Sequence, residues 1–139
     1  MWQKSYSKRI KGLDVGQVWK VWTDVDQWHT WQDDIQYARL EGAFTTGNRI
    51  RFKPKGGPRF NLELTRVEAE AVFVDLTQFP LAKMYDSHEL IRHGDELEIK
   101  TTITVSGPLS LVWRKLVAEN VAKGMSEQTD RLIEKVRNG

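Results

Sequence analysis

The sequence contains no cysteine, so neither a disulfide framework nor a thiolate metal site can form. It also lacks long apolar runs, because its 40% hydrophobic residues are interspersed with 29% charged residues. That distribution excludes a helical membrane span and also differs from the composition of disordered chains. The opening segment MWQKSYSKRIKG has no apolar stretch like that of a secretory signal. We therefore expect a cytoplasmic protein with a real hydrophobic core and no integral membrane association.

Neither sign of charge dominates: 21 basic and 19 acidic residues are mixed along the 139 positions, and the net charge is +2. The densest basic segment, RIRFKPKGGPR, places Arg49, Arg51 and Lys53 on one face of a strand. Such a row is typical of the solvated outer face of a sheet. KGGP also lacks the following Lys-Ser or Lys-Thr of a phosphate-binding loop. We predict no nucleic acid partner.

The periodicity of the apolar residues predicts the α+β class. Residues 2–10 alternate in polarity as a strand does, and Asp14 is a suitable N-cap for a short helix after it. Val25, Trp28 and Trp31 then recur at three-residue intervals, which is the spacing of one helical face. Two short helices are therefore expected between the first strand and the second.

From Ile35 onward, segments of alternating polarity separated by glycine and proline predict six successive antiparallel strands. After Pro108 the apolar period changes to that of a helix, on a stripe that runs from Leu109 to Val136 with Gly124 inside it. A curved sheet with one apolar face must be covered, and only this last helix is long enough. We predict one domain, 1–139, with a seven-stranded curved antiparallel sheet wrapped on a long C-terminal helix.

Three segments carry a resemblance to a known family: VWKVWTDVDQWHTWQDDI, LEGAFTTGNRIRFKP and HELIRHGDELEIKTTITVSGPLSLVWRKLVAENVAKGM. In their order and spacing the sequence resembles the START-like, or SRPBCC, superfamily, in particular its polyketide cyclase/dehydrase and lipid transport branch. The resemblance implies the helix-grip fold, with a cavity between sheet and helix that admits apolar or amphipathic small molecules. It selects no activity, because the superfamily includes lipid carriers, plant hormone receptors, aromatase/cyclases and chaperone activators.

The segment DVDQWHTWQDD combines two tryptophans, a histidine and four aspartates. Large aromatic residues at helical spacing are usually core, and each indole ring can bury on the order of 200 Å². The aspartates suit helix caps and solvent, and His29 lies off the apolar face. We interpret the segment as packing, and the resemblance implies that its rings also border the cavity.

His88 is the stronger chemical candidate. It shares one strand face with Asp86 and Leu90, whereas Ser87 lies on the opposite face and cannot act as a nucleophile with it. The apolar pattern does not decide which face is inward, but the resemblance favours the His88 face, where hairpin pairing would bring Thr101 close. There His88 would orient a polar ligand group or act as a general base. The alternative is a histidine that is hydrogen-bonded to a neighbouring strand or exposed.

These arguments favour a binding module for an apolar small molecule over two alternatives, an aromatase/cyclase-type enzyme and a chaperone-activator-like interaction module. We expect no cofactor, and no metal site because the three histidines are scattered and no HExxH motif occurs. The predicted cavity lining consists of Trp28, Trp31, Phe52, Leu64, Leu76, His88, Thr101, Ile103, Leu116, Val121 and Met125.

Overall fold

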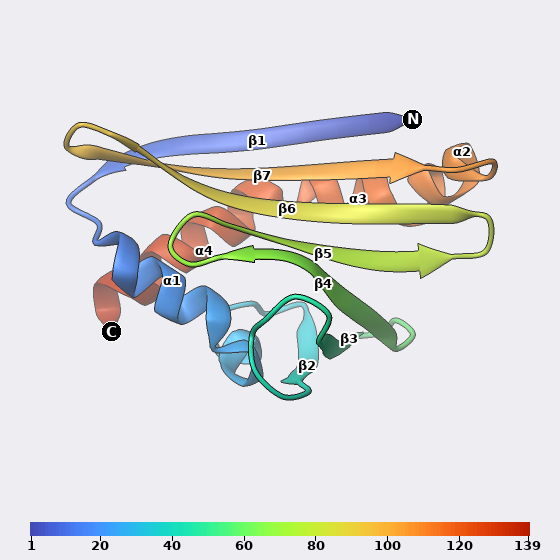
Figure 1. Ribbon diagram of the computed structural model, residues 1–139, viewed down its shortest axis with the longest axis horizontal. Helices are drawn as coiled ribbons and strands as arrows, with labels where there is room; N and C mark the ends of the chain where they lie inside the picture. The colour runs from blue at the N-terminus through green and yellow to red at the C-terminus, as the bar shows by residue number, and fades with distance from the viewer.

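The computed structural model describes residues 1–139, and its order of elements is the predicted one (Figure 1). The strands are β1 (Trp2–Lys11), β2 (Ile35–Leu40), β3 (Arg49–Pro54), β4 (Phe60–Glu68), β5 (Val72–Phe79), β6 (Ala82–His93) and β7 (Glu96–Ser106). The helices are α1 (Val15–Thr23), the 3₁₀ helix η1 (Val25–Thr30), α2 (Ser110–Trp113), the π-helical η2 (Arg114–Ala118), α3 (Glu119–Lys123) and α4 (Met125–Asn138).

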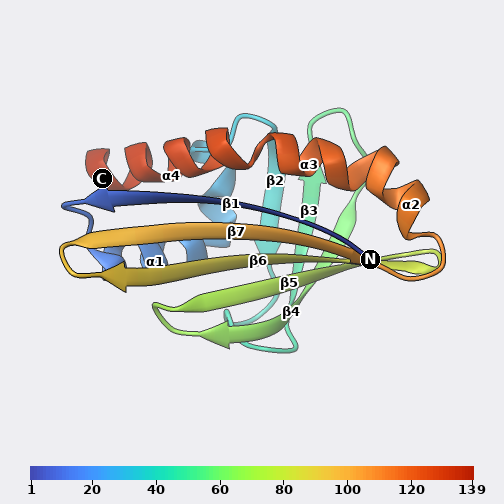
Figure 2. The same cartoon turned by 90° about the horizontal axis from the view of Figure 1, so that it is seen from above.

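The seven strands form one antiparallel sheet in the order β1-β7-β6-β5-β4-β3-β2. The sheet is strongly curved, since β2 and β3 run across the direction of β1 and β7 (Figure 2). The segments from α2 to α4 follow one another along its concave side, and α1 packs against α4 while η1 packs against β2. None of these helices is long and apolar enough to cross a membrane.

The two short helices are held by local hydrogen bonds. The Asp14 carboxylate accepts a hydrogen bond of 3.3 Å from the Gln17 backbone N–H, so it caps α1 as predicted. Trp28 Nε1 donates to the Trp22 carbonyl at 3.0 Å, which ties η1 to the end of α1. Because a 3₁₀ helix has three residues per turn, the predicted spacing puts Trp28 and Trp31 on one buried face. The predicted packing role of this segment is confirmed.

The C-terminal helix differs from the predicted continuous stripe. Its π-helical turn, η2, takes more residues per turn than an α-helix does, so the apolar period of the second half does not extend into the first. Leu116 is consequently 66% exposed and Val121 37% exposed, whereas Ala118 and Ala122 face the core. Gly124 ends α3 and precedes α4, so the helix is interrupted where the sequence places its glycine.

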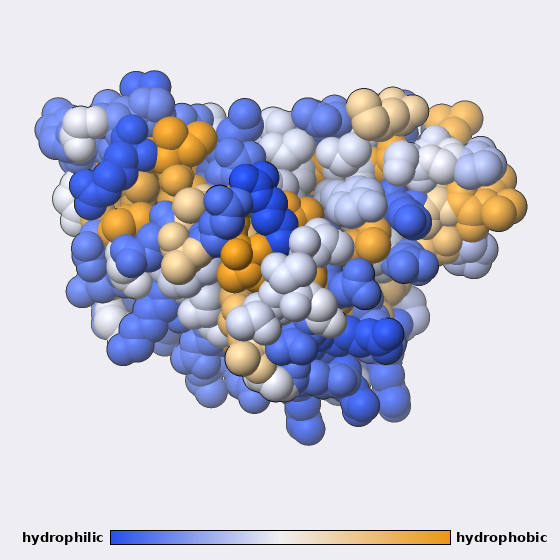
Figure 3. Space-filling model, viewed as in Figure 1, coloured by the Kyte–Doolittle hydropathy of each residue, from blue (hydrophilic) through white to orange (hydrophobic).

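Apolar surface also gathers at the end of the molecule where α2 lies (Figure 3). The exposed apolar side chains of α2 and the turns beside it are Leu81, Leu109, Leu111 and Val112. None of these four lines the cavity described below. Trp113, in contrast, stacks on Phe79 at 4.4 Å between ring centroids and donates to the Pro80 carbonyl at 2.9 Å, which anchors the start of the helix.

The SGPL turn before α2 requires its glycine. Gly107 has a φ of +109°, and a Cβ there would lie 2.7 Å from the Leu81 carbonyl oxygen and 3.0 Å from Ala82 Cα. We expect Gly107→Ala to lower the free energy of unfolding by about 1 to 3 kcal/mol in urea denaturation. Gly94→Ala is the control, because its φ is also positive but nothing lies within 4 Å of the added Cβ. Equal losses in both variants would show that the close approach to Leu81 is not the cause.

Candidate functional site

A cavity of about 640 Å³ lies between the concave face of the sheet and the C-terminal helix. It is bordered by strands β2 to β7, by α1, η1 and the loop after η1, by the β3–β4 hairpin and by the C-terminal helix. Leu116 and Val121 border it although they are exposed, so they lie at its mouth. Nine of the eleven predicted residues line the cavity: Trp28, Trp31, Phe52, His88, Thr101, Ile103, Leu116, Val121 and Met125.

The prediction is wrong for Leu64 and Leu76. Leu64 lies on the concave face, opposite Asp75, but is fully buried in the main core cluster and does not border the cavity. Leu76 lies on the convex face, where its partners are Glu63 and Tyr85. The sequence argument placed the apolar residue of this strand inside, and an alternation shifted by one residue reverses the whole strand.

Asp75 is a candidate site residue that the sequence analysis missed. It lies on the concave face of β5, borders the cavity and is only 4% exposed. No hydrogen bond joins its carboxyl group to the rest of the protein, and the nearest ionisable nitrogen is His88 Nε2 at 4.0 Å. The signal in the sequence was a charged residue inside the apolar strand VFVDL, which is unusual because unpaired carboxylates are rarely buried.

Asp75, Asp86 and His88 form a cluster on the floor of the cavity, which we call the floor cluster. Asp75 and Asp86 are direct partners on neighbouring strands, and His88 follows Asp86 on the same face. His88 Nε2 lies 3.1 Å from Asp86 Oδ1. The predicted pairing of His88 with Thr101 and its proximity to Asp86 are confirmed. The floor cluster therefore combines two carboxyl groups and one imidazole at the bottom of a cavity.

Aromatic packing fixes the orientation of the His88 ring. The ring stacks on Phe73 with 4.4 Å between centroids and an interplanar angle of 20°. Trp22 packs its edge against the same ring at 5.6 Å. Because rings on two sides restrict rotation, Nε2 stays close to the carboxyl groups without any further hydrogen bond.

Burial and mutual proximity shift the pKa values in the floor cluster. Burial raises the pKa of Asp75 well above its usual range, the Asp86 carboxylate raises it further, and His88 opposes both effects. Burial alone would lower the pKa of His88, but the charges of Asp86 and then Asp75 raise it overall. The arrangement therefore favours a proton on Asp75 and an ion pair between His88 and Asp86.

Two buried polar atoms on residues that line the cavity have no hydrogen-bond partner, Trp31 Nε1 and Asp86 Oδ1. His88 Nε2 is within ion-pair distance of Asp86 Oδ1, but its N–H is not directed well enough for a hydrogen bond. Orphaned buried polar atoms are rare in folded proteins. Both atoms are also inaccessible to solvent, so a ligand group would reach them only if the side chains move.

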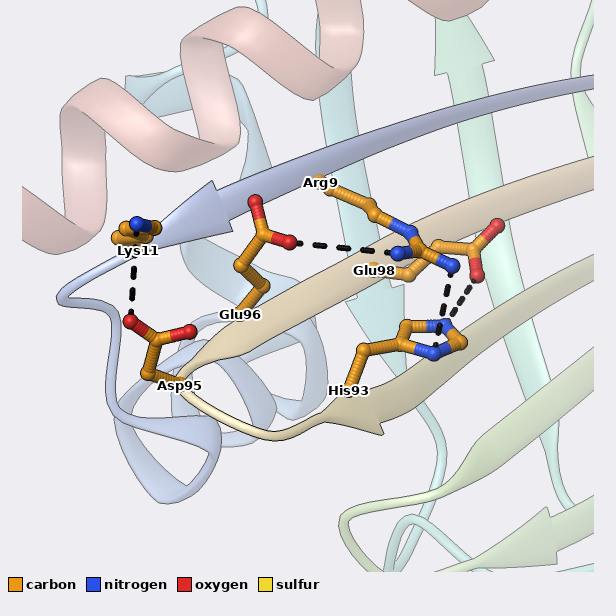
Figure 4. A network of polar contacts seen from close by, with 6 residues as sticks. All are labelled: Arg9, Lys11, His93, Asp95, Glu96 and Glu98. Atoms are coloured by element: carbon orange, nitrogen blue, oxygen red, sulfur yellow. Dashed lines mark hydrogen bonds and ion pairs between the residues drawn. The ribbon is translucent and has the colours of Figure 1, made fainter.

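His93 shows the contrasting case of a histidine outside the cavity. It lies 2.7 Å from Glu98 at the end of the β6–β7 hairpin, beside the pair of Arg9 with Glu96 (Figure 4). The hydrogen bond from His93 lowers the pKa of Glu98. Ion pairs at the protein surface contribute little to stability, and these partly buried and exposed residues do not border the cavity. We therefore regard the His93 network as a surface feature.

No family model matches this sequence, and no curated protein matches it either. Solved structures do match, among them a hypothetical protein from Helicobacter pylori, with a TM-score of 0.77, 17% identity, and coverage of 96% of this chain and 87% of that one. A START superfamily protein from Mycobacterium smegmatis has a TM-score of 0.69 and 14% identity, covering 98% and 97%. This chain has the helix-grip fold. The fold implied by the sequence resemblance is confirmed.

A third structure with the helix-grip fold is norcoclaurine synthase from Thalictrum flavum in complex with dopamine and hydroxybenzaldehyde, with a TM-score of 0.72 and 12% identity. It matches 99% of this chain and 88% of its own. Identities this low establish the fold alone. The chemistry of this helix-grip protein must therefore be argued from its own cavity.

The floor cluster also places three potential metal ligand atoms within 4.8 Å of one another. The expectation of no metal site rested on the spacing of histidines along the chain. That argument does not cover Asp75, Asp86 and His88, which come from neighbouring strands. Two carboxylates and an imidazole suit several divalent ions, so a metal ion is one occupant that experiments must distinguish from others.

Proposed function

We propose that this protein binds a small, largely apolar molecule in its cavity and carries or senses it in the cytoplasm. The observation that carries the proposal is a cavity of about 640 Å³, a size that lies within the range of small-molecule sites. Apolar atoms form more of its surface than polar atoms do, and Asp75, His88 and Thr101 are buried polar residues among them, as in sites that orient a ligand. Its aromatic lining consists of Trp22, Trp28, Trp31, Phe52, Phe60, Phe73 and Phe79.

Two further observations support the proposal. The norcoclaurine synthase complex shows that a helix-grip protein can hold small aromatic molecules. In this chain the floor cluster supplies polar groups among those walls. A ligand with an apolar body and a few polar groups would use both kinds of surface.

An aromatase/cyclase-type enzyme is the second candidate. The floor cluster favours it, because buried ionisable groups with shifted pKa values in a cleft are typical of catalytic acids and bases. Asp75 and His88 are the residues that would exchange protons with a substrate. Ser87 lies opposite Val74 and next to His88 in the chain, on the other strand face, so a hydrolytic nucleophile is not available there. No observation favours a chaperone-activator role.

Filling the cavity should weaken ligand binding. Met125 borders it and is 3% exposed, so the indole ring in Met125→Trp would occupy part of the volume. We expect wild-type protein to bind about one Nile red molecule per chain, and Met125→Trp to bind it about tenfold more weakly in fluorescence titration. Leu81→Trp, at a site 65% exposed and outside the lining, should bind as wild type does. Unchanged binding by folded Met125→Trp would place the dye elsewhere.

A further inference from the structure

We propose that the natural ligand carries a protonated amine, which binds between the carboxyl groups of Asp75 and Asp86 while its apolar body lies against the aromatic walls. This inference rests on the proposed small-molecule function and adds the chemical class of the ligand. It starts from the fact that the cavity holds two carboxyl groups, neither of them hydrogen-bonded to the protein, beside a single imidazole.

The two carboxyl groups occupy positions in which like charges destabilise the sheet. Asp75 and Asp86 are directly opposite each other on antiparallel strands, and like charges in that position destabilise a sheet. Burial increases the cost, because a carboxylate loses its hydration. The strand partners on either side contribute no cation, since Asp75 also faces Leu64 and Asp86 also faces Ile103. His88 is the only cationic side chain beside the two carboxyl groups, so the floor carries one net negative charge and can accept an ammonium group once Asp75 gives up its proton.

The basic side chains that border the cavity do not neutralise the carboxyl groups of the floor cluster. Arg131 borders the cavity, but it pairs with Asp33 at 2.8 Å and with Glu127 at 3.0 Å. Lys55 is exposed on the β3–β4 hairpin, and its backbone N–H donates to the carbonyl of Asp34, which lies in the loop before β2 and also borders the cavity. The lining as a whole therefore carries more acidic than basic residues, although the whole chain has a net charge of +2. A cation would enter this cavity more favourably than an anion.

The walls next to the floor cluster favour an organic cation over a bare metal ion. Phe73 and Trp22 both contact the His88 ring and border the cavity. Aromatic faces attract ammonium groups and pack well against flat apolar bodies. A metal ion would use the carboxyl groups but none of the apolar wall. An amine with an aromatic or aliphatic body would use both.

Three probes that share one ring system test the proposal: naphthylethylamine, naphthylethanol and naphthylacetate. In isothermal titration calorimetry at neutral pH, we expect the amine to bind at least about tenfold more tightly than the alcohol, and the carboxylate to bind most weakly. Asp75→Asn should abolish the preference for the amine and leave the affinity for the alcohol within about twofold. Asp95→Asn, at an exposed carboxylate in the β6–β7 turn outside the cavity lining, should keep the preference.

The possible outcomes separate this inference from the proposed function. If Nile red and the alcohol bind but the amine has no advantage in wild type, the ligand class is wrong and the binding function stands. If neither the dye nor any probe binds to folded protein, the proposed function itself fails.

Titration with Zn²⁺ and Mn²⁺ alone tests the alternative occupant. Tight metal binding that is lost in Asp75→Asn would make a metal ion the occupant. Circular dichroism confirms folding, and Asp86→Asn replaces Asp75→Asn should the latter not fold.

Discussion

Asp75→Asn should make the protein more stable at neutral pH, although it removes a side chain that we place in the binding site. Asp75 is buried without a hydrogen bond and opposite a second carboxyl group, so its ionised form is strongly disfavoured in the folded state. Asparagine has nearly the same shape and no charge to bury. We expect the free energy of unfolding at neutral pH to increase by about 1 kcal/mol, as found for stabilising substitutions at strained functional sites.

The pH dependence of stability provides the more specific measurement. The pKa of Asp75 is raised in the folded protein, so between the unfolded and folded pKa values the folded state holds more protons. The free energy of unfolding should therefore fall as the pH rises through that interval. The raised pKa of His88 acts in the same direction, because its stabilising effect is complete below the unfolded pKa and is lost as the pH rises through the folded one.

Urea denaturation at several pH values would measure both effects. Wild type should be more stable in mildly acidic than in mildly alkaline buffer, and Asp75→Asn should show a smaller difference. Asp34→Asn is the matched control, because that aspartate is exposed. A loss of stability in Asp75→Asn at neutral pH, with the steep pH dependence retained, would mean that Asp75 is ionised and well compensated in the folded protein.

The fold was predictable because its main signals are local and agree with one another. Alternation along β7, the capping aspartate of α1 and the three-residue spacing of η1 each follow from nearby residues alone. The pairing of His88 with Thr101 was predictable for a similar reason. The turn between His93 and Glu96 is short, and a short hairpin fixes the register of the strands it joins.

The site was less predictable because the sequence argument assumes that the apolar residues of a strand face inward, and the polar residues of this cavity do not follow that assumption. In β5 the inward residue is Asp75 and the outward one is Leu76, so choosing the apolar residue selected the wrong face. The π-helical turn in η2 was also not predictable, because no local pattern indicates an additional residue per turn; Leu116 lines the cavity as predicted but is 66% exposed at its mouth. Departures of this kind concentrate at functional sites, where chemistry competes with packing.

Binding of an amine should release a proton from the protein. The ammonium group arrives with its own proton, and Asp75 must give up the proton that it holds in the free protein in order to form the ion pair. Each amine bound should therefore release up to one proton to the buffer. The neutral alcohol makes no ion pair, so its binding should release none.

Calorimetry in two buffers with different ionisation enthalpies, phosphate and Tris, measures the number of protons released. Below the folded pKa of Asp75, the affinity for naphthylethylamine should also rise with pH, by at most tenfold per pH unit for one proton. Proton release should disappear in Asp75→Asn and persist in His88→Gln, which removes the other group that could lose a proton. Release that persists in Asp75→Asn but disappears in His88→Gln would assign the proton to the imidazole. In that case the amine would bind by displacing His88 from Asp86, and Asp75 would not be its partner.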